Sequence, residues 1–172
     1  SFAVINEAYA VENDDHSWIL DELSLLRSHF SGPIEFVNLL ALDISKIQQR
    51  LSLADVIYVV GGNTDYLMSV LMRSGLCGIL SDLLESCVYV GSSAGSMVLG
   101  KRVSTRAYQQ IYGEGDTFNT TSYCEYIDLA IKPHLNSPDW PNNRTEKLKE
   151  VSVGFSADVY GLSDTSAIVS ID

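Results

Sequence analysis

The residues best suited to chemistry are the serines of "CVYVGSSAGSMVLG", where an apolar stretch runs into Gly91-Ser92-Ser93-Ala94-Gly95. This pentapeptide matches G-x-S-x-G, a pattern in which the serine occupies a sharp, strained turn between a strand and a helix. The residues two positions away must be small, and the turn lifts the hydroxyl clear of the sheet for attack on a carbonyl. By register Ser93 is the predicted nucleophile, and Ser92 and Ser96 are neighbours of the same type. The alternative is a turn whose residues are small only because the packing around it requires small side chains, with no catalytic role for Ser93.

A serine hydroxyl is a poor nucleophile unless a base takes its proton. Of the three histidines, His134 in "IKPHLNS" directly follows the predicted strand Ile127–Ile131, so it falls at a strand end. We predict that His134 is the general base. His16 and His29 fall on or beside the first predicted helix, where exposed polar positions are expected.

An acid that orients the imidazole is harder to identify from the sequence. Four carboxylic acids lie between the serine and the histidine: Glu114, Asp116, Glu125 and Asp128. Asp128 falls inside a predicted strand and Glu125 just before it, whereas Glu114 and Asp116 lie in an irregular stretch that could present a side chain. Glu114 is favoured over Asp116.

A second group of small residues, Gly61-Gly62 in "VIYVVGGNTDYL", also follows an apolar stretch. Without side chains, their backbone amides can approach a ligand closely and hold an oxyanion. The amides of the helix that follows Ser93 can act on the same oxygen. A simple glycine turn before a helix capped by Asn63 or Thr64 is the other interpretation, and both can hold together.

Strand and helix patterns alternate along the chain, which predicts one α/β domain over residues 1–172 with a parallel sheet and helices on both faces. Residues 101–124 show no clear element. The chain ends in a predicted hairpin about "SDTS", formed by Val159–Leu162 and Ala167–Ile171. The other predicted strands are 2–5, 34–40, 56–60 and 87–90, and the predicted helices are 15–29, 43–51, 64–75, 76–85 and 144–151.

The composition narrows the class of protein. The chain has 172 residues, of which 46% are hydrophobic, enough for one well-buried core. A net charge of −11 argues against nucleic acid as a partner. No stretch reaches the roughly 18 apolar residues of a membrane span, and no signal peptide is recognised, so a cytoplasmic protein is expected. The three cysteines lack the spacing of a metal site.

Five segments together resemble the S51 serine peptidases: "VVGGNTDYL", "VGSSAGSMVLG", "IKPHLNS" with the downstream "NRTEKLKE", and "VYGLSDTSAI". This family contains the peptidase E (aspartyl dipeptidase) group and its cyanophycinase relatives. The resemblance implies a flavodoxin-like three-layer sandwich, as in class I glutamine amidotransferases, with serine in place of cysteine. It also implies a serine, an acid and a histidine in that chain order. An N-terminal strand before "FAVINEA" is expected to be missing from this chain.

Carried over to this chain, the resemblance makes Ser93 the nucleophile and His134 the base, with the amides of Gly62 and Ala94 as the oxyanion hole. Arg144 falls near the family's basic residues that receive an acidic substrate side chain. Arg144 and Asn63 are therefore the expected substrate-binding residues. A solvated helix position is the alternative for Arg144.

The expected function is a serine exopeptidase or dipeptidase that acts on short peptides, with a preference for N-terminal Asp. No metal or organic cofactor is implied, and the oligomeric state stays open, with a homodimer as one option. The alternatives are a catalytically silent relative that binds a small ligand or partner, and a cyanophycinase-like hydrolase. A glutamine amidotransferase would need cysteine at position 93, and "GGNT" and "KPHLN" do not indicate an α/β-hydrolase esterase.

Overall fold

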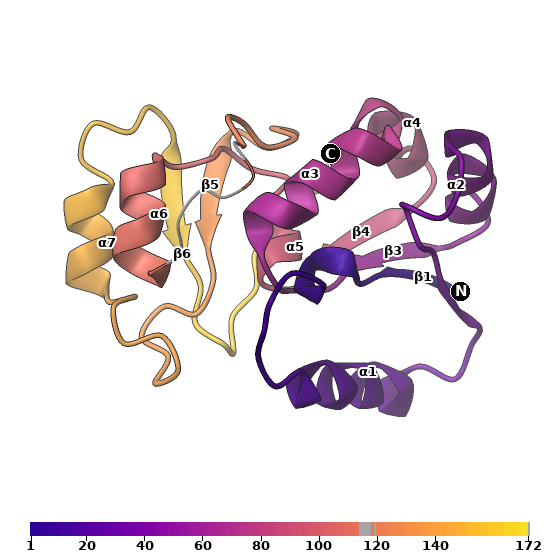
Figure 1. The fold of residues 1–172 in the computed structure, drawn as a ribbon, viewed down its shortest axis with the longest axis horizontal. Helices are drawn as coiled ribbons and strands as arrows, with labels where there is room; N and C mark the ends of the chain where they lie inside the picture. The colour runs from indigo at the N-terminus through magenta and orange to yellow at the C-terminus, as the bar shows by residue number, and fades with distance from the viewer. Residues whose placement is uncertain (114–117, 119, 172) are drawn as a thin grey trace. The chain divides into compact units, whose positions relative to one another are not determined.

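The computed structural model describes residues 1–113, 118 and 120–171. The chain forms two compact units, Ser1–Gly95 and Ser96–Asp172 (Figure 1). That they constitute a single domain stays a prediction. In the part of the chain that the structure describes, no helix is both long enough and apolar enough to cross a lipid bilayer.

The first unit is built on a four-stranded parallel sheet, as predicted. Its strands are β1 (Phe2–Ile5), β2 (Ile34–Phe36), β3 (Val56–Val59) and β4 (Val88–Gly91), in the order β2-β1-β3-β4. The two central strands carry much of the core, because β1 and β3 are rich in β-branched and other apolar residues that are fully buried. Both strands that precede the predicted chemical groups, β3 and β4, lie side by side in this sheet.

Helices cover both faces of this sheet (Figure 1). Two helices of the first unit have clear end signals: Asp43 accepts a hydrogen bond from the Lys46 amide at 3.0 Å, and Gly75 ends a helix in the left-handed conformation at φ +80°. One face carries α1 (Ser17–His29). The other carries α2 (Ile44–Leu51), α3 (Thr64–Ser74) and α4 (Leu80–Leu84), with the short 3-10 helices η1 (Glu7–Tyr9) and η2 (Leu76–Gly78) in the connections.

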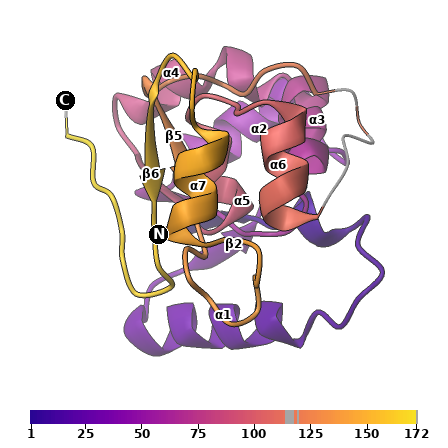
Figure 2. The same cartoon turned by 90° about the vertical axis from the view of Figure 1, so that its left-hand side faces the viewer.

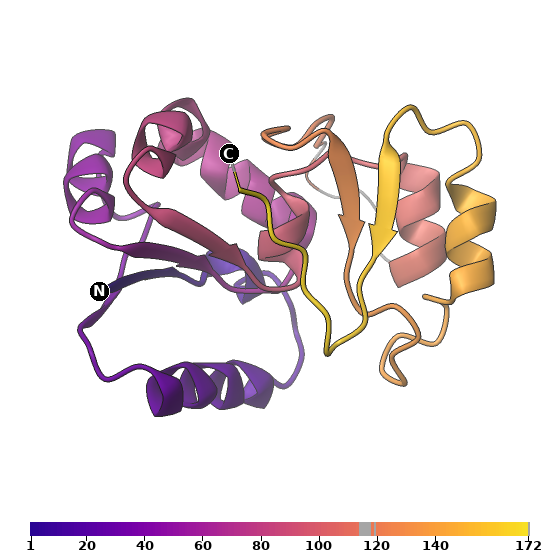
Figure 3. The ribbon, with the colours of Figure 1, turned by 180° about the vertical axis from the view of Figure 1, so that it is seen from behind.

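The second unit pairs two strands in parallel, β5 (Leu129–Lys132) with β6 (Asp158–Gly161). The intervening helix α7 (Thr145–Val151) returns the chain, so that β6 runs in the same direction as β5. The predicted terminal hairpin is therefore wrong. Residues Ala167–Ile171 form no strand, and Figure 3 shows the chain after β6 as an extended trace.

The prediction that residues 101–124 hold no element is also wrong, because α6 spans Thr105–Tyr112. Ser104 caps it by accepting a hydrogen bond from the Ala107 amide at 3.2 Å, and Gly113 ends it at φ +77°. This helix packs beside α7 (Figure 2). A capping serine, buried residues three or four apart and a closing glycine were the local signals for this helix.

Candidate active site

Ser93 occupies a tight turn between β4 and the short helix α5 (Ala94–Met97). Its backbone is left-handed, with φ +48°, which costs a residue with a side chain about 1–2 kcal/mol. Backbone hydrogen bonds hold the turn, from the Ser92 amide to the Val59 carbonyl at 2.9 Å and from the Gly95 amide to the Ser92 carbonyl at 2.8 Å. The strained conformation that G-x-S-x-G predicts is therefore present at Ser93.

The glycines around Ser93 are required by close packing. A Cβ atom at Gly95 would lie 2.1 Å from the Val59 carbonyl oxygen, so no larger residue fits there. At Gly61, a Cβ atom would lie 2.9 Å from Cβ of Ser93 and 3.4 Å from its Oγ. The end of β3 thus borders the serine hydroxyl directly, and a side chain at position 61 would displace that hydroxyl.

Gly62 is the second glycine at the end of β3, and its φ of +129° is unfavourable for residues with side chains. A Cβ atom there would lie 2.5 Å from the carbonyl carbon of Ala8. The neighbouring Asn63 donates its amide to the Ala8 carbonyl at 2.9 Å, and its side chain caps α3 by accepting from the Tyr66 amide at 2.9 Å. The capping interpretation is therefore confirmed, and a substrate contact of Asn63 stays a prediction.

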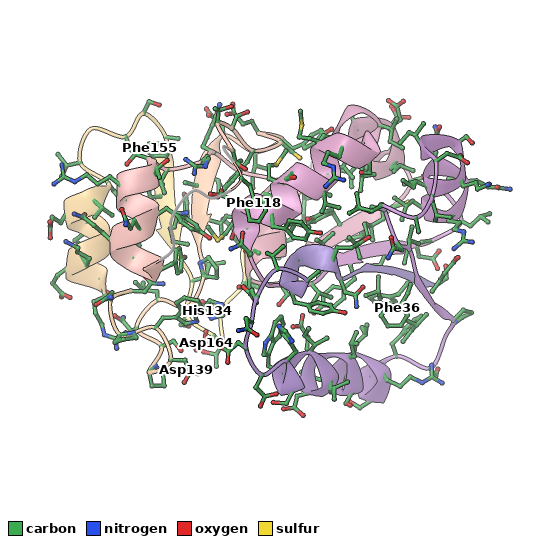
Figure 4. The ribbon with its side chains drawn as sticks, in the orientation of Figure 1. Phe36, Phe118, His134, Asp139, Phe155 and Asp164 are labelled. Atoms are coloured by element: carbon green, nitrogen blue, oxygen red, sulfur yellow. The ribbon has the colours of Figure 1, made fainter. Side chains whose placement is uncertain are left out.

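His134 follows the end of β5, as the sequence predicted, and its backbone is left-handed with φ +63°. Its Nδ1 lies 2.7 Å from Oδ1 of Asp164, a residue that follows the end of β6. Figure 4 shows both side chains near the carboxyl ends of the two strands. Two backbone hydrogen bonds of 2.8 Å, Leu135 amide to Leu162 carbonyl and Leu162 amide to Lys132 carbonyl, hold the two segments together.

Asp164 is the functional candidate that the sequence analysis missed, although it lies in the quoted segment "VYGLSDTSAI". Hydrogen bonds from the Ser137 hydroxyl and then from His134 hold the pKa of Asp164 below its ordinary value, against the opposing effect of desolvation. Asp164 is therefore ionised at neutral pH and can only accept hydrogen bonds. The proton of a neutral His134 must then sit on Nδ1, which leaves Nε2 as the basic nitrogen.

The structure describes only two of the four acids that the sequence offers as partners of His134. Glu114, the favoured one, and Asp116 both lie outside the described residues. Lys101 pairs with Glu125 at 2.9 Å and with Asp128 at 3.7 Å, so a surface cation already engages these two carboxylates. Across residues 1–113, 118 and 120–171, no group of three or more His, Cys, Asp or Glu side chains could hold a metal ion.

Arg144 immediately precedes α7 and is half-buried, so it is not the solvated helix residue of the alternative interpretation. Its Nη1 donates to the backbone carbonyls of Ser137 at 2.8 Å, Trp140 at 3.1 Å and Asn143 at 3.2 Å. The guanidinium therefore ties together the loop that follows His134. A contact of Arg144 with a substrate carboxylate stays a prediction.

The other two histidines differ from each other. His29 is exposed at the end of α1, as predicted. His16 is half-buried instead, because its ring packs against the ring of Tyr9 with a centroid separation of 5.0 Å. Both belong to the first unit together with Ser93, whereas His134 and Asp164 belong to the second.

The chain is similar in sequence to known peptidases. The model of peptidase family S51 matches residues 8–172. An uncharacterized peptidase of Listeria monocytogenes is 29% identical over 139 residues, which cover 78% of this chain and 65% of the relative. Peptidase E of Streptomyces coelicolor is 31% identical over 123 residues, covering 68% of this chain and 49% of the relative. The matched part thus spans about half to two thirds of the length of these relatives.

Solved structures show the same fold. The crystal structure of a Listeria monocytogenes protein assigned to peptidase E superposes with a TM-score of 0.74 at 24% identity, covering 95% of this chain and 77% of the other. A peptidase from an acI-B1 actinobacterium superposes with a TM-score of 0.62 at 19% identity, covering 94% and 66%. The α/β fold with its parallel sheet is therefore structurally similar to peptidase E.

Proposed function

The chain belongs to peptidase family S51, and from this membership we propose that it is a serine peptidase that hydrolyses short peptides. The observation that carries the proposal is the left-handed backbone of Ser93 in a glycine-lined turn at the end of β4. Nucleophilic serines are presented on such strained turns. We propose further that the complete fold is the three-layer sandwich of class I glutamine amidotransferases. A cytoplasmic location and a homodimer stay predictions from the sequence.

In the proposed reaction, Oγ of Ser93 attacks the carbonyl carbon of the scissile peptide bond while Nε2 of His134 takes the hydroxyl proton. The amides of Gly62 and Ala94 stabilise the oxyanion that forms. His134 then gives its proton to the leaving amine, and an acyl-enzyme on Ser93 remains. A water molecule, deprotonated by His134, hydrolyses the ester and restores the free serine.

We propose Asp164 as the acid of this triad, in place of an acid between Ser93 and His134. It is ionised, and its hydrogen bond with Nδ1 holds the imidazole in the tautomer that can accept a proton. An adjacent carboxylate also stabilises the imidazolium that forms after proton transfer. The chain order is then serine, histidine, acid.

Replacing Asp164 with asparagine should lower kcat on the order of 10⁴-fold, because an amide at this position no longer selects the reactive tautomer. The measurement is steady-state hydrolysis of a dipeptide by Asp164→Asn and by Glu125→Gln. The second variant removes a carboxylate that pairs with Lys101 at the surface, and it should keep near wild-type activity. Wild-type activity in Asp164→Asn would contradict the assignment and direct attention to Glu114.

We propose that the substrates are dipeptides with N-terminal Asp and that Arg144 receives the aspartyl carboxylate. An arginine can hold a carboxylate by two parallel hydrogen bonds, which is the usual solution for selective recognition. The side-chain hydrogen bonds that the structure describes for Arg144 are donated by Nη1, so we propose that a substrate carboxylate would use the other guanidinium nitrogens.

The test of this function compares hydrolysis of matched Asp-X and Ala-X dipeptides. The wild type should prefer Asp-X, and Arg144→Ala should reduce the ratio of the two kcat/KM values by about 10- to 100-fold, the worth of a charged hydrogen bond. An equal loss on both substrates would show that Arg144 only holds the loop after His134. Hydrolysis of neither dipeptide by the wild type would favour the silent relative that binds a ligand.

A further inference from the structure

His134 is held by Asp164 at a ring nitrogen, and the indole of Trp140 lies against the face of the same ring. The hydrogen bond to Asp164 holds Nδ1 at 2.7 Å, and the His134 side chain is 27% exposed. A hydrogen bond at one ring nitrogen fixes the position of that atom, whereas a contact on the ring face restricts the tilt of the ring. The indole of Trp140 lies against the imidazole, with ring centroids 5.6 Å apart and planes inclined by 20°. This geometry is in the range of favourable offset stacking.

Trp140 is itself held on two sides. Its ring meets the ring of Tyr112 edge to face at 5.3 Å, and the Tyr112 hydroxyl donates to the Pro133 carbonyl, next to His134, at 3.2 Å. Its backbone carbonyl accepts a hydrogen bond from Arg144. In addition, the fully buried Asn143 donates its side-chain amide to the Pro133 carbonyl at 2.6 Å. The loop therefore presents the indole at a defined place beside the imidazole.

We propose that Trp140 is a positioning residue for the His134 base, which deepens the proposed function and rests on it. Its ring keeps the imidazole in the plane that satisfies Asp164 and directs Nε2 away from the carboxylate. An indole face also attracts a cation, so Trp140 stabilises the imidazolium once the serine proton has been transferred. Asp164 at the ring edge and Trp140 at the ring face act on the same charged state.

Charged side chains also lie on the described elements around Trp140 and His134. Asp164 follows β6, and Asp139 and Arg144 lie on the loop that carries Trp140, with Asp139 exposed (Figure 4). Lys132, at the end of β5, is fully buried with its Nζ over the rings of Tyr108 and Tyr112, at 5.5 and 5.8 Å. Trp140 therefore contacts the base directly, while Arg144 acts on it only through the loop.

Fluorescence tests the contact without requiring catalysis. A protonated imidazole in contact with an indole quenches its emission, and the chain has only two tryptophans, Trp18 and Trp140. In a Trp18→Phe background, emission should fall on acidification, and the transition should vanish when His134→Gln is added. Emission that does not titrate, or that titrates unchanged without His134, would overturn the proposal. Because no substrate is involved, this result stands even if the chain hydrolyses no peptide.

Kinetics then test the consequence for the base. In Trp140→Leu, kcat should fall by about 3- to 10-fold, the worth of one aromatic pair, with KM unchanged. The acid limb of the kcat/KM profile, which reports protonation of the base, should move to lower pH by about half a unit as the cation–π contact is lost. Trp140→Phe keeps an aromatic face and should restore both. A Trp140→Leu enzyme with a lower melting temperature but wild-type kcat and acid limb would show a merely structural role.

Discussion

Replacing Ser93 with alanine should abolish peptide hydrolysis, lowering kcat on the order of 10⁴-fold or more. Oγ of Ser93 is the atom that forms the acyl-enzyme in the proposed reaction. The fold should be little affected, because serine and alanine both carry a Cβ atom and bear a similar cost of the left-handed backbone, and the substitution removes only Oγ. Steady-state kinetics on the preferred dipeptide and thermal unfolding of both proteins measure the two effects separately.

The matched control for this result is Ser92→Ala, one position earlier in the same turn. Ser92 contributes backbone hydrogen bonds to the turn, which alanine preserves, so activity should stay near that of the wild type. A fluorophosphonate probe should label the wild type and Ser92→Ala on Ser93 and leave Ser93→Ala unlabelled. Loss of labelling in Ser92→Ala with full labelling of Ser93→Ala would mean that the register of the turn is misassigned.

Removing the base should be as damaging as removing the nucleophile. His134→Ala should lower kcat on the order of 10⁴-fold or more, because the serine proton then has no acceptor and the leaving amine no donor. The backbone at position 134 is left-handed, a conformation that histidine adopts more readily than alanine, so His134→Ala should also lose some stability. His134→Asn is therefore the better-folded variant, because asparagine favours this conformation, and it should be equally inactive.

Two further variants test whether the loss of activity is specific to His134 and to its action together with Ser93. His29→Ala should be close to neutral, since that side chain is exposed on α1. The double variant Ser93→Ala/His134→Ala should be hardly worse than either single variant, because residues that act as a unit do not contribute additively. If the two losses instead multiplied, Ser93 and His134 would not share one chemical step.

Most of the local structure was predictable because its signals are short-range. The helices that begin after Asp43 and end at Gly75, and the strained turn at Ser93, each depend on contacts within a few residues, and they form close to the predicted positions. The parallel sheet followed from the alternation of strands and helices. The helix at Thr105–Tyr112 is the exception, because its local signals lie in a stretch otherwise rich in polar residues.

What the sequence alone determined, then, is the family, the parallel α/β fold and the two positions, Ser93 and His134, at strand ends. The partner of His134 was decided only by tertiary structure. Asp164 reaches Nδ1 because β6 lies parallel to β5 and the two strands end in register, which a predicted terminal hairpin would not allow. The stacking of Trp140 on the imidazole likewise requires the loop held by Arg144. Contacts of this kind depend on how the chain returns through space, and neither spacing nor residue type encodes that path.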